Sequence, residues 1–166
     1  MAIVDKAGSV NNLSSVDTPN AKFAQNVTAG GKLKLFRDTV EIAAADDDGS
    51  KYRLARLPFN AVIESISIEH DSITGGTDYD LGLYDTPETN SGAVIDADVL
   101  ADGISLATAG TKDGFANVDR ANKHKKLWEL AGLTEAATKL VDVVLTGNTV
   151  GTAAGTATLT IQYTLD

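Results

Sequence analysis

Apolar and polar residues alternate along much of the chain after residue 31. The clearest alternation sets four threonines and Gln162 against Ala157, Leu159, Ile161, Tyr163 and Leu165. Successive side chains of a β-strand point to opposite faces, so a period of two is typical of a strand with one buried face. The pattern predicts a strand over residues 156–165.

Two other stretches also have the pattern of a strand. In residues 65–70, Ile66, Ile68 and His70 share one face, so His70 is expected to be a partly buried, hydrogen-bonded histidine rather than a catalytic one. In residues 140–145, apolar residues occupy both faces, and this strand is expected to be covered on both sides.

The stretch "TDYDLGLYDT", residues 77–86, combines alternation with three aspartates. Tyr79, Leu81 and Leu83 would point to one face and Asp78 and Asp80 to the other, which predicts a half-buried strand with its aspartates in solvent. Asp85 would begin the following turn. The alternatives are a weak cation site and, less favoured, a catalytic acid pair, which needs further convergent groups.

Turn-forming residues separate several of these strands. Strand patterns on either side of "DDDGS" predict a hairpin, with Asp46, Asp47 and Asp48 bonding backbone groups in its turn rather than forming a calcium loop. The glycine- and threonine-rich "TGNTVGTAAG" predicts a second hairpin loop before the last strand. Asp96, Asp98 and Asp102 also lack a calcium-loop spacing, and short strands or a helical turn with polar edges would explain them.

One window, "DRANKHKKLWELAGL", predicts a helix. Asp119 or Asn122 could cap it, Gly132 could end it, and Trp128 would anchor it against a sheet. Its apolar stripe contains Leu127, Leu130 and Ala131, and His124 is expected to be exposed among lysines.

These elements predict an all-β protein. Seven or eight short strands, one short helix and no βαβ rhythm favour an antiparallel β-sandwich, with a jelly roll as first choice and an immunoglobulin-like topology as the alternative. Residues 31–166 would form this domain. Residues 1–30, rich in Ser, Asn, Gly and Thr, predict an N-terminal arm that is either a disordered tail or a segment that orders against a partner.

The net charge and the composition restrict the kinds of partner and of site that are expected. The formal net charge of −9 disfavours nucleic acid and anionic membranes as partners and is consistent with docking onto a basic patch of another protein. The absence of cysteine excludes disulfides, thiolate metal sites and cysteine nucleophiles. The N-terminus lacks the long apolar run of a signal peptide or membrane span, so synthesis in a cytoplasm without export is expected.

No motif for catalysis or cofactor binding is visible. The chain has no zinc pattern or nucleophile elbow, and "GKLKLF", with Gly31 and Lys32, lacks the spacing of a phosphate loop. We therefore predict no catalytic residues, no metal site and no cofactor, and an enzyme is disfavoured. A structural or binding role remains.

Several segments together resemble small virion proteins of tailed bacteriophages. They are "KYRLARLPFNAVIESISIEHDSITGGTDYDLGLYDT", "GAVIDADVLADGISL", "KKLWELAGL" and "GTATLTIQYTLD", which lie in this order within residues 51–166, a span of about two thirds of the chain. The resemblance implies a jelly-roll capsid decoration or cement protein. Such a protein binds the outside of the assembled head, bridges subunits of the major capsid protein, and forms dimers or trimers. It implies no catalytic residues, and residues 1–30 have no counterpart in it.

The resemblance also implies a location on the outer surface of the virion, after synthesis in the host cytoplasm. The alternative is a carbohydrate-binding β-sandwich on a fibre or head surface. Sugar sites favour exposed aromatic side chains, and this chain has only one Trp and four Tyr.

Overall fold

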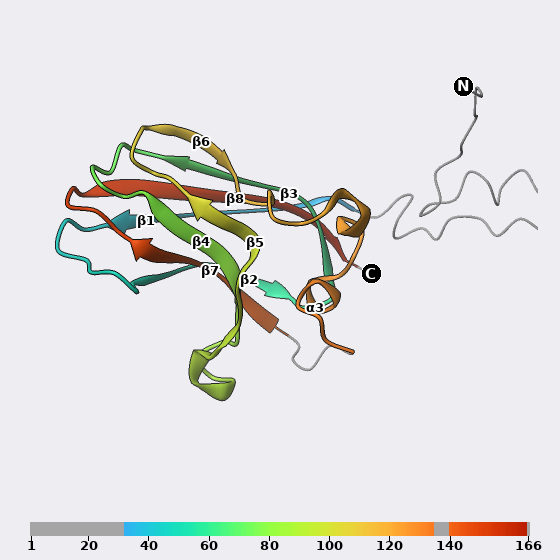
Figure 1. The fold of residues 1–166 in the computed structure, drawn as a ribbon. Coiled ribbons are helices and arrows are strands. Elements are labelled where there is room, and N and C mark those ends of the chain that lie inside the picture. Colours follow the sequence, from blue (N-terminus) through green and yellow to red (C-terminus); the bar gives the residue numbers. More distant parts are fainter. Residues whose placement is uncertain (1–31, 135–139, 166) are drawn as a thin grey trace, which may run out of the picture.

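The computed structural model describes residues 32–134 and 140–165. They form two four-stranded antiparallel sheets packed face to face as a β-sandwich (Figure 1). The elements in chain order are β1 (Lys34–Ile42), β2 (Lys51–Pro58), β3 (Ala61–His70), β4 (Asp78–Tyr84), η1 (Asn90–Gly92), β5 (Val94–Ile104), β6 (Gly110–Asp113), η2 (Arg120–Asn122), α3 (Leu127–Leu130), β7 (Leu140–Thr149) and β8 (Gly155–Leu165). The all-β prediction is confirmed.

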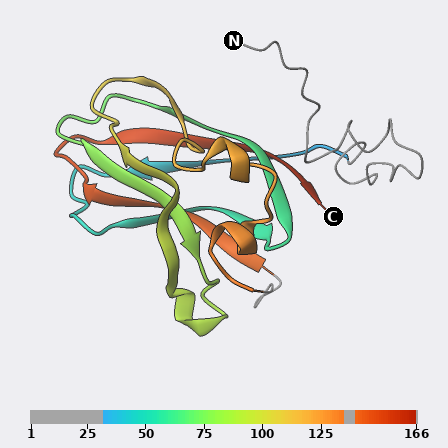
Figure 2. The same ribbon diagram turned by 45° about the vertical axis from the view of Figure 1, so that its right-hand side comes forward.

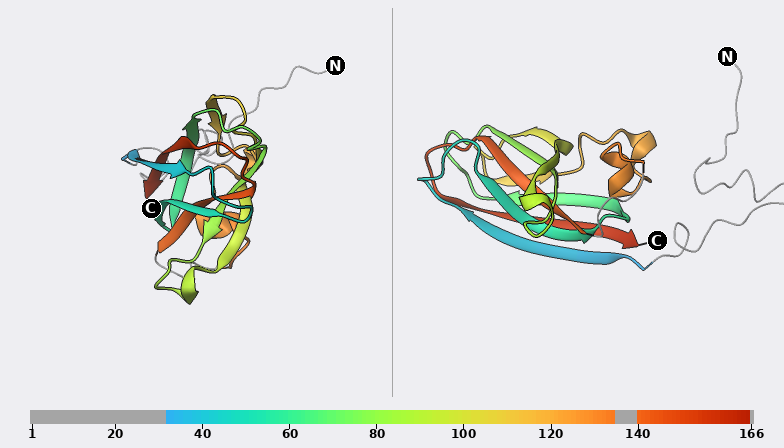
Figure 3. Two further views of the ribbon diagram at one scale, coloured as in Figure 1. Left: turned by 90° about the vertical axis from the view of Figure 1, so that its left-hand side faces the viewer. Right: turned by 90° about the horizontal axis from the view of Figure 1, so that it is seen from below.

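The strand order identifies the topology. One sheet, sheet A, has the order β1-β8-β3-β6, and the other, sheet B, has the order β2-β7-β4-β5. Every connection crosses from one sheet to the other except that between β4 and β5, and the two layers can be followed in Figures 2 and 3. Eight strands wound in this way form a jelly roll, as predicted, rather than an immunoglobulin-like sandwich.

Both predicted hairpins are wrong. The strands on either side of "DDDGS" are β1 and β2, which pair with β8 and β7 in different sheets, and "TGNTVGTAAG" likewise joins β7 in sheet B to β8 in sheet A. Turn-forming residues of this kind occur both in tight hairpins and in loops that cross from one sheet to the other, so they do not distinguish the two. The turn itself is as predicted, because Asp46 Oδ2 accepts the Ala43 N–H and Asp47 Oδ1 accepts the Asp48 N–H.

The core lies between the inward faces of the two sheets. In β8, Ala157, Leu159 and Ile161 are fully buried and the intervening threonines are half-buried, as the alternation predicted. In β7 both faces are buried from Val141 to Gly147, which confirms the expectation for that strand. The central positions of β8, between β1 and β3, and of β7, between β2 and β4, explain this burial.

The predicted helix is two separate turns. Asp119 caps the 3-10 turn η2 by accepting the Ala121 N–H, and α3 is a single turn followed by Gly132 with φ of +70°. Between them, Lys126 forms a β-bridge with Val62, so the lysine-rich stretch leaves the helical conformation. The caps were predicted correctly and the continuous helix was not. The Trp128 side chain packs against the core, consistent with the predicted anchor, and its backbone N–H donates to the Phe59 carbonyl.

The predicted arm, residues 1–30, lies outside the described residues, so its role stays a prediction. Within residues 32–134 and 140–165, no helix is long and apolar enough to cross a membrane.

Candidate docking surface

Strand β4 carries the aspartates that the sequence placed in solvent, and this prediction is wrong for Asp80. Only 9% of Asp80 is exposed, and its carboxylate accepts the Gly103 N–H at 3.1 Å and an Asn148 Nδ2–H at 2.6 Å. The irregular strand β5 explains the burial. Its backbone lies so close over the outer face of β4 that a Cβ on Gly82 would come 2.2 Å from the Ala97 carbonyl oxygen.

Two aspartates of β5 also have perturbed acidities. A hydrogen bond with Asp80, reinforced by its charge, raises the pKa of Asp102 above the usual range. Burial, followed by a hydrogen bond with Asp98, raises the pKa of Asp96. These carboxyl groups contact each other in pairs, and no group of three or more His, Asp or Glu side chains within the described ranges could hold a metal ion.

The other candidate residues from the sequence are the two histidines and the aspartates of the turn before β2. Those that are buried or bonded make contacts that stabilise the fold. His70 is 7% exposed, and its Nδ1–H donates to the Asp71 carbonyl at 2.8 Å, so the prediction of a buried, hydrogen-bonded histidine is confirmed. Asp48 Oδ1 accepts the Val150 N–H at 3.0 Å, and Tyr52 donates its hydroxyl to Asp46 at 2.9 Å. These bonds attach the β1–β2 turn to the loop after β7 and to β2. His124 is exposed, as expected.

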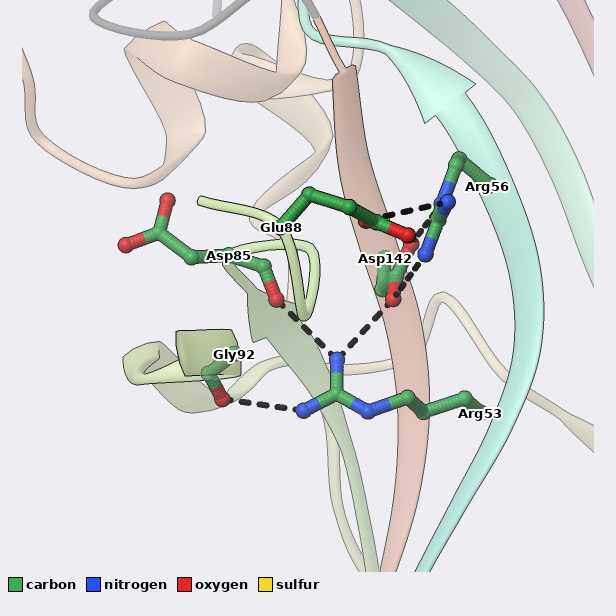
Figure 4. Close-up of polar contacts among 6 residues, drawn as sticks. All are labelled: Arg53, Arg56, Asp85, Glu88, Gly92 and Asp142. Carbon is green, nitrogen blue, oxygen red and sulfur yellow. Dashed lines mark hydrogen bonds and ion pairs between the residues drawn. The ribbon is translucent and has the colours of Figure 1, made fainter. Parts of the chain in front are cut away.

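A polar cluster that was not predicted lies on the outer face of sheet B (Figure 4). Its centre is Asp142 of β7, whose side chain is only 3% exposed. Arg53 Nη1 lies 2.9 Å from Asp142 Oδ2, and Arg56 Nε lies 2.7 Å from Oδ1. Arg56 Nη2 also donates to Oδ2 at 3.2 Å, so Arg56 binds the carboxylate through two nitrogens. The two cations offset the cost of burying this carboxylate.

The same arginines hold the loop between β4 and β5, residues 85–93. Arg53 donates to the Asp85 carbonyl at 3.0 Å and to the Gly92 carbonyl at 2.9 Å, at the two ends of the loop. Arg56 Nη1 lies 3.4 Å from Glu88 Oε2. We call Arg53, Arg56 and Asp142 the arginine clamp and residues 85–93 the clamped loop. Together they fix a surface protrusion to the sheet.

The clamped loop has an unusual backbone. Asn90 and Ser91 have φ of 50° and 53°, in the left-handed region that residues other than glycine adopt rarely. Asn90 compensates by donating its side-chain amide to Asp85 at 3.1 Å. Such conformations persist where the surroundings determine them, and here the clamp and the loop's own backbone bonds do so.

The chemistry of the clamp is that of a support. Asp142 accepts hydrogen bonds from two guanidinium groups, and its hydrogen bond raises the pKa of Arg56 further, so Arg56 stays a cation. The pKa of Glu88 is lowered, chiefly by its own backbone N–H and by Thr86. The arrangement can hold a loop in a fixed shape for a partner.

Exposed apolar side chains lie beside this loop. Val94, which follows the loop, is 56% exposed, and Leu140, two residues before Asp142 on the same face of β7, is 44% exposed. Tyr84 pairs with both Val94 and Asp142, so these side chains share the outer face of sheet B. The clamped loop, Val94 and Leu140 form the candidate docking surface. Its mixture of apolar and charged groups is typical of protein interfaces.

Sequence reasoning missed the clamp because its members are far apart in the chain. Nothing in the local sequence singles out Arg53 or Arg56, and only the pairing of β2 with β7 brings them to Asp142. One signal was available: Asp142 is the only charged residue in the otherwise apolar "LVDVVL", and a carboxylate in a strand with two covered faces needs a cationic partner.

No protein-family model and no curated protein sequence matches the chain. Among solved structures, a chain in the capsid of Ralstonia phage GP4 superposes with a TM-score of 0.60 at 19% sequence identity, over 82% of this chain and 86% of that one. Chains in the capsids of cyanophage Pam1 and of Helicobacter pylori bacteriophage KHP30 superpose less closely. Their TM-scores are 0.47 and 0.42 at 16% and 19% identity, covering 82% and 81% of this chain and 87% and 92% of theirs. The first likeness supports the fold.

Proposed function

We propose that this protein is a structural component of a phage virion. It binds the outer surface of the assembled head and stabilises the head by bridging subunits of the major capsid protein. The observation that carries the proposal is the jelly roll, which is similar over most of its length to a chain in the capsid of Ralstonia phage GP4. The order of the phage-like segments in the sequence supports it independently.

The physical argument for such a role is mass action. A protein that binds the expanded shell but not its precursor stabilises the expanded form in proportion to its free concentration relative to Kd. Many copies on one shell multiply modest contacts. The net charge of −9 favours a basic patch on the capsid as the site of attachment.

We propose the candidate docking surface as the part that contacts the capsid. The clamp fixes the conformation of the loop before binding, which reduces the entropy lost on association. Val94 and Leu140 supply apolar area, and Glu88, with a side chain 72% exposed, supplies a charge that suits a basic partner.

The test is co-sedimentation of the full chain with expanded and unexpanded capsids assembled from the major capsid protein of the same phage. We expect binding to the expanded shell, and at least about tenfold weaker binding by the double variant Val94→Asp, Leu140→Asp. A matched control, Thr111→Asp with Ala116→Asp, adds the same charge at exposed positions outside the docking surface and should bind like the wild type.

Two results would overturn parts of this proposal. If the wild type binds neither shell, the virion role is wrong. If it binds but the control weakens binding as much as the double variant does, the docking surface is wrong and only the role survives.

The structure gives the carbohydrate-binding alternative no specific support. Tyr52, Tyr79 and Tyr84 are buried, and Trp128 is packed against the core. Among the described residues, the large apolar side chains that are well exposed are aliphatic.

A further inference from the structure

The edge strands of the two sheets differ in how they are protected against further pairing. A row of unpaired N–H and C=O groups is a template for another strand, and proteins block such edges with prolines, bulges, charges or short strands. Here β2 has a bulge and Pro58, β5 has several register shifts, and β6 has only four residues. Strand β1 has nine residues, no proline, and an unbroken register with β8. Its charged side chains are two cations, Lys34 and Arg37, and two anions, Asp38 and Glu41, so another strand with the opposite order of charges could still pair with it.

Among the described residues no strand pairs with the outer edge of β1, and the backbone groups along this free edge can be assigned. The Thr39 N–H donates to the neighbouring Asp38 carboxylate at 2.8 Å, so it points away from β8. Because backbone groups alternate in direction along a strand, the N–H and C=O groups of Leu35, Arg37, Thr39 and Glu41 all face the free edge. The Thr39 and Thr158 hydroxyls lie 2.9 Å apart, consistent with a closely spaced pair on the β8 side.

Apolar side chains gather at the start of the same strand. Leu35 is 64% exposed and Leu33, just before the strand, is 58% exposed, the two most exposed large apolar side chains among the described residues. Phe36 and Val40 are only partly buried at the rim of the core. An exposed apolar edge with unpaired backbone groups is a site for strand addition.

We propose that a second copy of this chain adds to this edge, with its β1 antiparallel to the first and a two-fold axis passing beside Phe36. Sheet A then continues through both copies as one eight-stranded sheet. This register places Lys34 opposite the partner's Asp38, twice, by symmetry. It pairs the edge groups of Leu35 with those of the partner's Arg37, and it covers Leu33 and Leu35.

The neighbouring registers are less complementary. An axis beside Arg37 or Asp38 places that residue opposite its own copy, and like charges directly opposite are destabilising. An axis beside Thr39 pairs Arg37 with the partner's Glu41, but it leaves Leu33 and Leu35 uncovered and places Asp38 opposite Val40. The register with its axis beside Phe36 is therefore favoured, because it pairs unlike charges and covers Leu33 and Leu35.

The interface is isologous, so charge exchange tests it directly. We expect the full chain to sediment as a dimer at micromolar concentrations, and Lys34→Glu or Asp38→Lys alone to weaken the dimer by at least about tenfold. An equimolar mixture of the two single variants should recover the affinity, because each contact in the mixed dimer again joins unlike charges. The controls Lys112→Glu and Glu69→Lys make the same changes on β6 and β3 and should leave the dimer intact.

Cysteine cross-linking reports the register independently, because the chain has no native cysteine. Phe36→Cys should form a disulfide-linked dimer on mild oxidation, since residues beside the axis come within disulfide range. Thr39→Cys would cross-link instead if the alternative register holds. A wild type that stays monomeric at about 100 µM would overturn the proposal, as would a mixture of charge variants that fails to recover the dimer. Neither result bears on capsid binding.

Discussion

Asp142 illustrates how one residue determines the shape of the candidate docking surface. It is almost fully buried, yet the arginines that neutralise it are 30% and 41% exposed and also bind the clamped loop. Removing one partner of a buried ion pair destabilises chiefly because the other charge is left without compensation. Here the arginines can turn to water, so the loss should be smaller than in a fully buried pair.

We therefore expect Asp142→Asn to lower the free energy of unfolding by about 1–3 kcal/mol. Urea denaturation measures this change, and faster hydrogen exchange in residues 85–93 would show that the loop is released. Glu64→Gln neutralises an exposed carboxylate and should have little effect. An unchanged denaturation midpoint in Asp142→Asn would contradict the assigned role of the clamp.

Asp102 gives a prediction about pH. Contact with Asp80 raises its pKa in the folded protein, so the folded state binds the proton more tightly than the unfolded state does. The carboxyl therefore contributes stability below its unfolded pKa of about 3.9, and this stability is lost as pH rises through the higher folded pKa.

Asp102→Asn should consequently be more stable than the wild type at neutral pH, and the difference should shrink as the pH falls toward about 4. Denaturation midpoints of both proteins across this range measure the effect, with Glu64→Gln as the control. A constant difference at every pH would show that Asp102 is not penalised in the folded state.

At the scale of elements, the sequence predicts strands well and their partners poorly. Alternation in β8 and covered faces in β7 follow from local residue order, and the structure confirms both. Asp80 was misplaced because its burial depends on β5, whose backbone covers β4 only where Gly82 leaves room. The clamp was missed for the same reason: it depends on which strand pairs with which. Each of these errors arose because the result depends on which strands pair in the folded protein, and the local residue pattern does not determine that pairing.

The central position of β8 makes a quantitative prediction. Ile161 is fully buried and pairs with Phe36 of β1 on one side and Ile66 of β3 on the other. Ile161→Ala should lower the free energy of unfolding by about 2–5 kcal/mol, because it removes transfer free energy and leaves a cavity. Gln162→Ala, the neighbour on the outer face, should change it by less than about 1 kcal/mol. Equal urea midpoints for the two variants would mean that β8 does not face the core as described.

At the scale of the whole molecule, the jelly roll separates surfaces for different contacts. The outer face of sheet B carries the clamped loop, whereas β1, the edge proposed for self-pairing, belongs to sheet A, the other layer of the sandwich. A protein that bridges capsid subunits needs more than one contact surface. A capsid-facing loop and a self-pairing edge would supply two surfaces without competition.

The N-terminal residues give the last prediction. Within residues 32–134 and 140–165 the buried core runs from Ile42 to Ile161. We expect deletion of residues 2–20 to leave the Tm nearly unchanged. Residues 1–30 nevertheless contain scattered apolar side chains, among them Val10, Leu13 and Val16, which a purely solubilising tail does not need. We expect the deletion to weaken capsid binding or self-association by at least about tenfold, or ~1.4 kcal/mol, because a segment that orders on a neighbour adds contact area.

Thermal denaturation and capsid co-sedimentation of the truncated and full-length chains separate the possible results. If the truncated chain binds capsids as tightly as the full chain does, residues 2–20 are only a tail. A truncated chain that does not fold would instead place residues 2–20 within the sandwich and move the predicted domain boundary at residue 31. A stable truncated domain with weak binding is the result that the proposal requires, because only then are folding and attachment carried by different parts of the chain.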